Sequence, residues 1–553
     1  MGGHHPRMAN AHSHHHGHPT KRPWQRLSEA LRLERADVLT IMAFAVATGV
    51  LSIVTPAAIE ALVNTVAFGI QLWPVIVLAL VMFAFLALQN ALKALQLYVA
   101  ELLQRRFFVR TADAFAEHFA RAEIEAFDGR NPTDVVNRFF EVASVQKALA
   151  TLLVDGVGVA MITIVGLAVL AFYHPYLLTF AVVMVALVLF LLFALGIGGV
   201  RTSIGESYAK FDMAAWLEEL AKCPHTFRFG RGGAVAIERA DALAEAYVSA
   251  RRQHYRVVWR QTIFALVLEA VASTVLLGLG GWLVIQRQLT LGQLVAGELL
   301  VTLVLTAISK IGKYIEAFYD LQASLDKLGV LDTLPLERLG GETLPPSDRP
   351  MDVRAEVAYG GRPLKRLEVK PGERIGVYAP SGSGKTFLLE TLALLRVPKE
   401  GLLEFDGIDA RSLDRAATRL QLAYVGHAEI FADTVAENIR VGRSDLSAAD
   451  VRRALEMVGL ADDVARLPQG VATPIASDGR PLSTNAVTRL SIARALAGKP
   501  RLLLINGVLD ALDLYDCPQL IDSLFDRSAP WSLVVVTMRD DIKQRCDRMV
   551  EWS

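Results

Sequence analysis

The chain has 553 residues, a length that allows two to four domains, and its 57 lysine and arginine residues balance 57 aspartate and glutamate residues. This balance excludes the bulk positive charge that attracts nucleic acids, so we expect no nucleic-acid partner. Hydrophobic residues make up 53% of the chain and the mean hydropathy is positive, which indicates that part of the chain lies in lipid.

The first segment, residues 1–19, is rich in glycine and histidine. Tracts of this composition either bind Zn²⁺, Ni²⁺ or Cu²⁺ loosely or form a disordered tail, and an engineered tag looks the same. No spacing within the segment defines a metal geometry, so we favour a disordered tail and leave metal binding open. The segment has no apolar core after its charges, so we do not expect a signal peptide.

Six apolar segments follow within residues 20–332, each close to the length of about 20 residues that crosses a bilayer as a helix. Two long polar stretches with helical patterning, 98–153 and 200–261, carry many lysine and arginine residues. The three short connections, near 65–73, 173–176 and 286–290, contain a single such residue, Arg287. The positive-inside rule therefore places the N-terminus, both long stretches and the C-terminal third in the cytoplasm. The predicted spans are 38–58, 75–97, 154–172, 177–199, 262–285 and 291–310.

Charged residues are rare in these spans, which argues against buried helices of a large soluble protein. Segment 177–199 has none over more than a membrane thickness. Three glutamates in or next to the spans stand out, because charged residues in membranes usually face a bundle interior or a water-filled cavity. We expect Glu269, the most central, to line a cavity for a solute. We expect Glu60 and Glu298 to lie near the membrane edge or in an interhelical hydrogen bond.

The composition changes at residues 333–350, where proline and glycine are dense and long apolar runs end, so this segment is predicted to be a linker. In residues 351–553 short apolar strands alternate with helical patterns, as in α/β nucleotide-binding domains. The predicted fold is thus an all-α six-helix transmembrane domain with long cytoplasmic helical extensions, followed by an α/β P-loop nucleotide-binding domain.

The clearest motif is Tyr378-Ala-Pro-Ser-Gly-Ser-Gly-Lys-Thr386, which follows an apolar strand and precedes a helical segment. This context favours a phosphate-binding loop over a glycine- and serine-rich surface turn. Lys385 should reach the β- and γ-phosphates, and the Thr386 hydroxyl should bind Mg²⁺. Ala379 replaces the first glycine, which is tolerable if the backbone there is not left-handed. We therefore predict that ATP and Mg²⁺ bind, with cofactor contacts from Ser381, Gly382, Ser383, Gly384, Lys385, Thr386 and Phe387.

Six spans with long cytoplasmic extensions, followed by such a loop, resemble a half-transporter of the type IV ATP-binding cassette exporters. The resemblance covers nearly the whole chain after residue 19. Residues 127–138 are similar to the stretch after the family's first coupling helix, 289–296 to the segment before the sixth span, and 371–377 to the lead into the loop. Tyr359 stands where the family often has an aromatic residue that stacks on adenine, with a core tyrosine as the alternative.

The resemblance implies a dimer of two halves that encloses two ATP molecules. Each ATP lies between the loop of one half and a Leu-Ser-Gly-Gly-Gln motif of the other. In this chain that motif reads Leu-Ser-Thr-Asn-Ala, residues 482–486, so Ser483 remains for a γ-phosphate contact while two glycines that allow close backbone approach are lost. His427 takes the place of the family's Mg²⁺-linked glutamine, with Gly426 as the alternative alignment.

The positions that are catalytic in the family differ even more from the family's pattern. Asn506 replaces the aspartate that ends the Walker B strand, Gly507 the glutamate that polarises the attacking water, and Met538 the switch histidine. Asparagine brings no charge, and neither glycine nor a thioether accepts a proton or holds that water. With His427, these are four degenerate positions, so the resemblance implies no catalytic residue.

We interpret the chain as a membrane half-transporter, expected in a bacterial inner (plasma) membrane, that binds ATP but is largely or wholly unable to hydrolyse it. It should act with a second half, identical or different, to export an unknown solute. The altered motif at 482–486 leaves open whether the assembled complex hydrolyses ATP. One alternative is a non-transporting membrane regulator with ATP as a structural ligand. Another is a slow homodimeric exporter with His427 as a substitute base.

Overall fold

The computed structural model describes residues 23–68, 72–129, 131–358, 363–398, 400–513 and 518–552. The histidine-rich tail and Tyr359 lie outside these ranges. The described residues form two compact units, one within Met1–Arg121 and Gly129–Pro335 and the other within Ala122–Asp128 and Leu336–Ser553.

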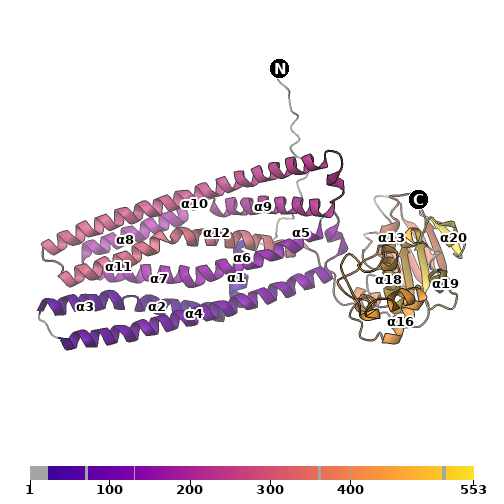
Figure 1. Cartoon of the computed structure of the whole chain (residues 1–553), viewed down its shortest axis with the longest axis horizontal. Coiled ribbons are helices and arrows are strands. Elements are labelled where there is room, and N and C mark those ends of the chain that lie inside the picture. Colours follow the sequence, from indigo (N-terminus) through magenta and orange to yellow (C-terminus); the bar gives the residue numbers. More distant parts are fainter. Residues whose placement is uncertain are drawn as a thin grey trace, which may run out of the picture. The chain divides into compact units, whose positions relative to one another are not determined.

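The first unit is a bundle of helices (Figure 1). In the described part of the chain, six helical segments are long and apolar enough to cross a membrane, which confirms the predicted six spans. The helices are α1 (Pro23–Leu33), α2 (Arg35–Leu51), α3 (Val54–Phe68), α4 (Leu72–Arg121), α5 (Pro132–Asn137), α6 (Glu141–Ala150), α7 (Val157–Tyr173), α8 (Pro175–Leu189), α9 (Gly199–Lys222), α10 (Gly232–Ile285), α11 (Leu291–Ser309) and α12 (Ile311–Leu328).

Two of these helices are far longer than a bilayer requires. Helix α4 has 50 residues and α10 has 54, and at about 1.5 Å per residue each is more than twice as long as the hydrocarbon core is thick. Each must therefore continue well beyond the membrane, as the polar helical stretches in the sequence predicted. Helix α10 runs alongside α9 over much of this extension (Figure 1).

The fourth span is interrupted between α8 and α9. The backbone passes through a π-helical turn, η4 (Phe190–Ala194), and then through Gly198 in the left-handed region, with φ of +87°. An unsatisfied carbonyl in lipid costs several kcal/mol, so a break needs donors from other helices. Here the donors are Arg260 Nε to Leu195 O at 3.0 Å, Gln261 Nε2 to Leu191 O at 3.2 Å, and Tyr319 Oη to Gly196 O at 3.3 Å.

The second unit is built on two main sheets. A parallel sheet has the order β11-β3-β10-β9-β6, and an antiparallel sheet has the order β2-β1-β4-β5. Apolar side chains on both faces of the parallel sheet are buried, as expected for strands covered by helices. The strands are β1 (Val353–Val357), β2 (Lys365–Val369), β3 (Arg374–Tyr378), β4 (Gly401–Phe405), β5 (Ile408–Asp409), β6 (Leu422–Val425), β7 (Asp433–Thr434), β8 (Pro474–Ile475), β9 (Leu502–Asn506), β10 (Ser532–Val536) and β11 (Arg548–Glu551).

Helices and turns connect these strands and complete an α/β domain, which confirms the predicted fold class. They are η1 (Ile124–Phe127), α13 (Lys385–Leu392), α14 (Arg415–Arg419), α15 (Val435–Arg440), α16 (Ala448–Met457), α17 (Ala461–Ala465), α18 (Thr484–Ala497), α19 (Pro518–Phe525) and α20 (Asp540–Lys543). In the parallel sheet Val536 pairs with both Val377 and Asn506, so β3, β10 and β9 end at one level. The loops after these strands therefore share one edge of the sheet.

The second unit also includes residues 122–128, which lie between α4 and α5 in the sequence. Arg396 donates from Nη1 and Nη2 to the two oxygens of Asp128, at 2.6 and 2.9 Å. This guanidinium lowers the pKa of the Asp128 carboxyl, so the bidentate pair stays ionised at neutral pH. The predicted domain boundaries, which placed all of 20–332 in one domain, did not include this discontinuity.

The predicted topology can be tested with single cysteines on a background in which Cys223, Cys517 and Cys546 are serine. A cysteine at position 68 or 288 should react with an impermeant maleimide in intact cells, and one at position 125 or 215 only after permeabilisation. Exposed Cys223 lies in the predicted cytoplasmic stretch and provides an internal control in the unmodified chain. Labelling of positions 125 and 288 from the same side would show that the six-span topology is wrong.

Candidate nucleotide-binding site

The loop between β3 and α13 has the backbone that phosphate binding requires. Gly382 and Gly384 have φ of +76° and +90°, a region that residues with a Cβ rarely adopt. Gly384 is also the N-cap of α13, so the loop runs directly into the positive end of a helix. Ala379 is buried and is not among the residues with positive φ, so its methyl group meets the condition predicted from the sequence.

Two side chains in this loop fit a phosphate ligand. The Ser383 hydroxyl is buried without a hydrogen-bond partner, which is costly unless a ligand supplies an acceptor. The Lys385 ammonium donates to the carbonyls of Ala379 and Pro380, at 2.5 and 2.9 Å, and so lies over the loop. Phosphate oxygens would satisfy both groups. The Phe387 side chain instead packs against the apolar core under the sheet. The part of Phe387 that can contact a ligand is therefore its backbone.

The Walker B position contacts the loop directly. Asn506, the last residue of β9, donates from Nδ2 to Thr386 Oγ1 at 3.0 Å. The same amide nitrogen lies 3.5 Å from the hydroxyl of Tyr424 on β6. The hydroxyl predicted to bind Mg²⁺ is therefore paired with a neutral amide.

The next two degenerate positions lie at the same edge of the sheet. Gly507 has φ of +74° and donates its N–H to Val536 O at 3.1 Å. Met538 follows β10, and its side chain is 62% exposed. The Asp510 carboxylate accepts from the Thr537 hydroxyl and from the Met538 backbone N–H, at 2.5 and 3.0 Å. This carboxylate thus fixes the loop that carries Met538.

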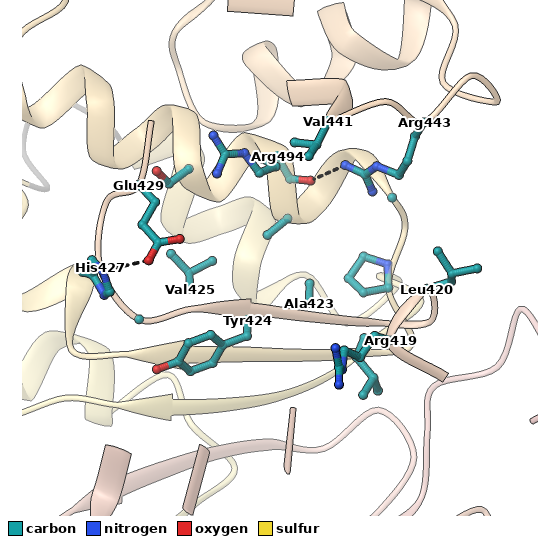
Figure 2. Close-up of a pocket in the computed structure, with 16 residues that line it drawn as sticks. Arg419, Leu420, Ala423, Tyr424, Val425, His427, Glu429, Val441, Arg443 and Arg494 are labelled. Atoms are coloured by element: carbon teal, nitrogen blue, oxygen red, sulfur yellow. Dashed lines mark hydrogen bonds and ion pairs between the residues drawn. The ribbon is translucent and has the colours of Figure 1, made fainter. Parts of the chain in front are cut away.

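His427 is turned to a different partner. Its Nε2 lies 2.8 Å from Glu429 Oε1, and both side chains are more than two-thirds exposed (Figure 2). The pair stands at one end of a cavity of about 400 Å³ beside β6 and α18, with Arg443 donating to the Arg494 carbonyl at the other end. The structure brings Asn506, rather than this imidazole, to Thr386, and the Tyr424 hydroxyl lies beside the Asn506 amide.

Ser483 is the N-cap of α18, the 14-residue helix that begins within the altered inter-subunit motif at 482–486. Its hydroxyl accepts from the Ala486 backbone N–H at 3.2 Å. Ser483 is exposed, so the hydroxyl and the free helix N-terminus face solvent. The neighbouring Asn485 has a buried side-chain oxygen without a partner.

The first unit contains a polar cavity of about 450 Å³ that the sequence analysis missed. Acidic and basic side chains from α6, α9 and α12 face each other in it, for example Lys210 and Glu141 at 3.3 Å, and α10 adds Tyr247. The available signal in the sequence was the helical spacing of charged residues just after the sixth span, at Lys313, Glu316 and Asp320. The charged lining residues are Glu141, Lys147, Glu206, Lys210, Lys313, Glu316 and Asp320.

The three glutamates within the spans differ in their contacts and in their exposure. Glu60 accepts a hydrogen bond from the Tyr173 hydroxyl at 2.7 Å, an interhelical contact that was one of the two arrangements expected for it. Glu298 is exposed on α11, and Glu269 is half-buried on α10.

Comparisons with known proteins agree with this architecture. Residues 38–210 match the family described as the ABC transporter transmembrane region, and residues 365–506 match the ABC transporter family. The leukotoxin translocation ATP-binding protein LktB of Mannheimia glucosida is 26% identical over 448 residues, covering 78% of this chain and 62% of the relative. A Mannheimia haemolytica LktB is 24% identical over 477 residues, covering 83% and 66%.

The chain therefore spans less than two-thirds of the length of these relatives. Among solved structures, a bacterial Atm1-family ABC exporter with ATP bound has a TM-score of 0.78. It is 20% identical, and the match covers 94% of this chain and 93% of that chain. This likeness shows a shared fold over almost the whole length.

Proposed function

From the premise that this chain is an ABC half-transporter with the exporter fold, we propose that it is an exporter subunit that binds ATP without hydrolysing it. It acts with a second half-transporter, a copy of itself or a different chain. Its proposed location is a bacterial inner membrane, with the nucleotide domain in the cytoplasm. The ATP-binding domain is intact in fold. What we propose that it has lost is the chemistry of ATP hydrolysis.

The observation that carries the proposal is the pairing of Asn506 with Thr386 beside a phosphate loop that keeps Gly384, Lys385 and Thr386. Hydrolysis needs a charged metal site and a group that orients the attacking water. An amide, a glycine and a thioether occupy the three positions that supply these functions in the family. The loop glycines, Ser383 and Lys385 supply what binding alone needs.

The polar cavity of the first unit favours a transporter over a membrane regulator with structural ATP. A cavity of about 450 Å³ lined by both acidic and basic side chains offers a site for a solute, which a transporter requires and a regulator does not. Such a lining suits a hydrophilic solute that carries charge, because each group offers a charge-assisted hydrogen bond. We propose that the solute is recognised there.

The proposal is tested by purifying the tagged chain from its native membranes in a mild detergent and identifying what remains bound. We expect a second half-transporter in a one-to-one ratio. Recovery of the chain as a monomer, with no half-transporter attached, would instead support the regulator.

A further inference from the structure

The residues that stand where Mg²⁺ is expected do not fit that ion. Mg²⁺ requires nearly octahedral oxygen ligands, and in P-loop proteins the loop hydroxyl and a Walker B aspartate hold it. Here Thr386 Oγ1 already accepts a hydrogen bond from Asn506 Nδ2 at 3.0 Å. An N–H donor at this oxygen competes for the lone pairs that a cation would use, and the asparagine brings no compensating negative charge.

Other carboxylates near this edge of the sheet are engaged elsewhere. Both oxygens of Asp510 accept hydrogen bonds from residues 537 and 538. Glu390 pairs with Arg396 at 2.5 Å, and Glu429 pairs with His427 at 2.8 Å. Within the described residues, no group of three or more histidine, cysteine, aspartate or glutamate side chains could hold a metal ion.

We propose that this cassette binds ATP as the metal-free anion, so that Mg²⁺ adds nothing to its affinity for the nucleotide. This inference rests on the proposed function, since it concerns the ligand of the same loop. Metal-free ATP carries more negative charge than its Mg²⁺ complex, and the Lys385 ammonium and the N-terminus of α13 attract it more strongly. A Walker B aspartate would repel the metal-free anion, whereas Asn506 does not.

The loss of that aspartate therefore acts twice. It removes the ligand that draws the metal in, and it removes the repulsion that otherwise makes the metal necessary. The unpaired Ser383 hydroxyl and the Lys385 ammonium can then serve the phosphates directly. A subunit of this kind would hold ATP in place without assembling the metal centre that cleavage requires.

The test is equilibrium binding of ATP to the detergent-purified full chain, with excess Mg²⁺ in one series and EDTA in the other. We expect the two Kd values of the unmodified chain to agree within about threefold. Asn506→Asp should weaken binding in EDTA by about tenfold or more, the scale of one charge–charge contact, and Mg²⁺ should restore it. Asn506→Ala removes the amide donor without adding charge, so its binding should remain insensitive to the metal.

A loss of about tenfold or more in the unmodified chain on adding EDTA would overturn the inference and leave the proposed function intact. Metal-insensitive binding by Asn506→Asp would also overturn it, because residue 506 would then not be the cause. Failure to bind ATP in either series would contradict the proposed function itself. Lys385→Ala supplies the background for both series.

Discussion

Lys385→Ala is expected to weaken ATP binding by at least about tenfold to a hundredfold, the range for loss of a charged hydrogen-bond donor. The ammonium now lies over the carbonyls of Ala379 and Pro380, on the loop that would enclose the phosphates. Binding is measured with the full chain in detergent. Lys499→Ala is the matched control, because that lysine is exposed in a surface pair with Asp450 and should change nothing.

Ser383→Ala separates binding from stability in the same experiment. Because the hydroxyl is buried without a partner, removing it should leave the melting temperature of the nucleotide-free protein unchanged or raise it. The increase in melting temperature on adding ATP should become smaller, since the bound state loses one hydrogen bond. Equal ATP binding by the unmodified chain and by Lys385→Ala would contradict the phosphate-loop assignment.

Features carried by contiguous sequence were predictable. The six spans follow from local hydropathy and length, and the loop follows from one motif between a strand and a helix. The contact between Asn506 and Thr386 was not predictable in the same way, because 120 residues separate them and the strand order β3-β10-β9 brings them together. The sequence showed that the aspartate was absent, and the structure shows what the asparagine contacts.

The break in the fourth span shows the same limit. Segment 177–199 is uninterrupted in hydropathy and contains no proline, so the sequence predicted a continuous helix. Three glycines near its end were the available signal, and a Cβ added to Gly199 would lie 2.2 Å from the Tyr319 ring. The donors that stabilise the break come from α10 and α12, and their side chains gave no sign of this role in a single sequence.

The unmodified chain alone is expected to release phosphate from ATP no faster than its Lys385→Ala variant. Gly507→Glu alone should not restore turnover. A glutamate at φ of +74° carries backbone strain of about 1–2 kcal/mol, although nothing lies within 4 Å of its Cβ position. The fold can therefore accept the side chain, but the carboxylate would have neither a charged metal site nor an imidazole beside it.

The smallest set of changes that we expect to matter is Asn506→Asp, Gly507→Glu and Met538→His. The first breaks the amide contact to Thr386 and frees that hydroxyl for Mg²⁺. The third places an imidazole on an exposed position whose backbone Asp510 already holds. Removing one such element from a competent site costs about 10²–10³ in rate, and elements that act as a unit are not additive, so partial repair should stay at background.

If the chain pairs with itself, the triple variant should also need Thr484→Gly and Asn485→Gly, because each site borrows the motif of the other half. These changes cost roughly 0.5 kcal/mol or less each in the first turn of α18, because threonine and asparagine are already poor helix formers, and the helix keeps its Ser483 cap. Steady-state phosphate release from reconstituted protein is the measurement, with Lys385→Ala added to each variant as its control. Robust turnover by the unmodified chain that is abolished by Lys385→Ala would show that the three altered positions do not prevent catalysis. Another group would then have to activate the water, and His427 would be the first residue to test.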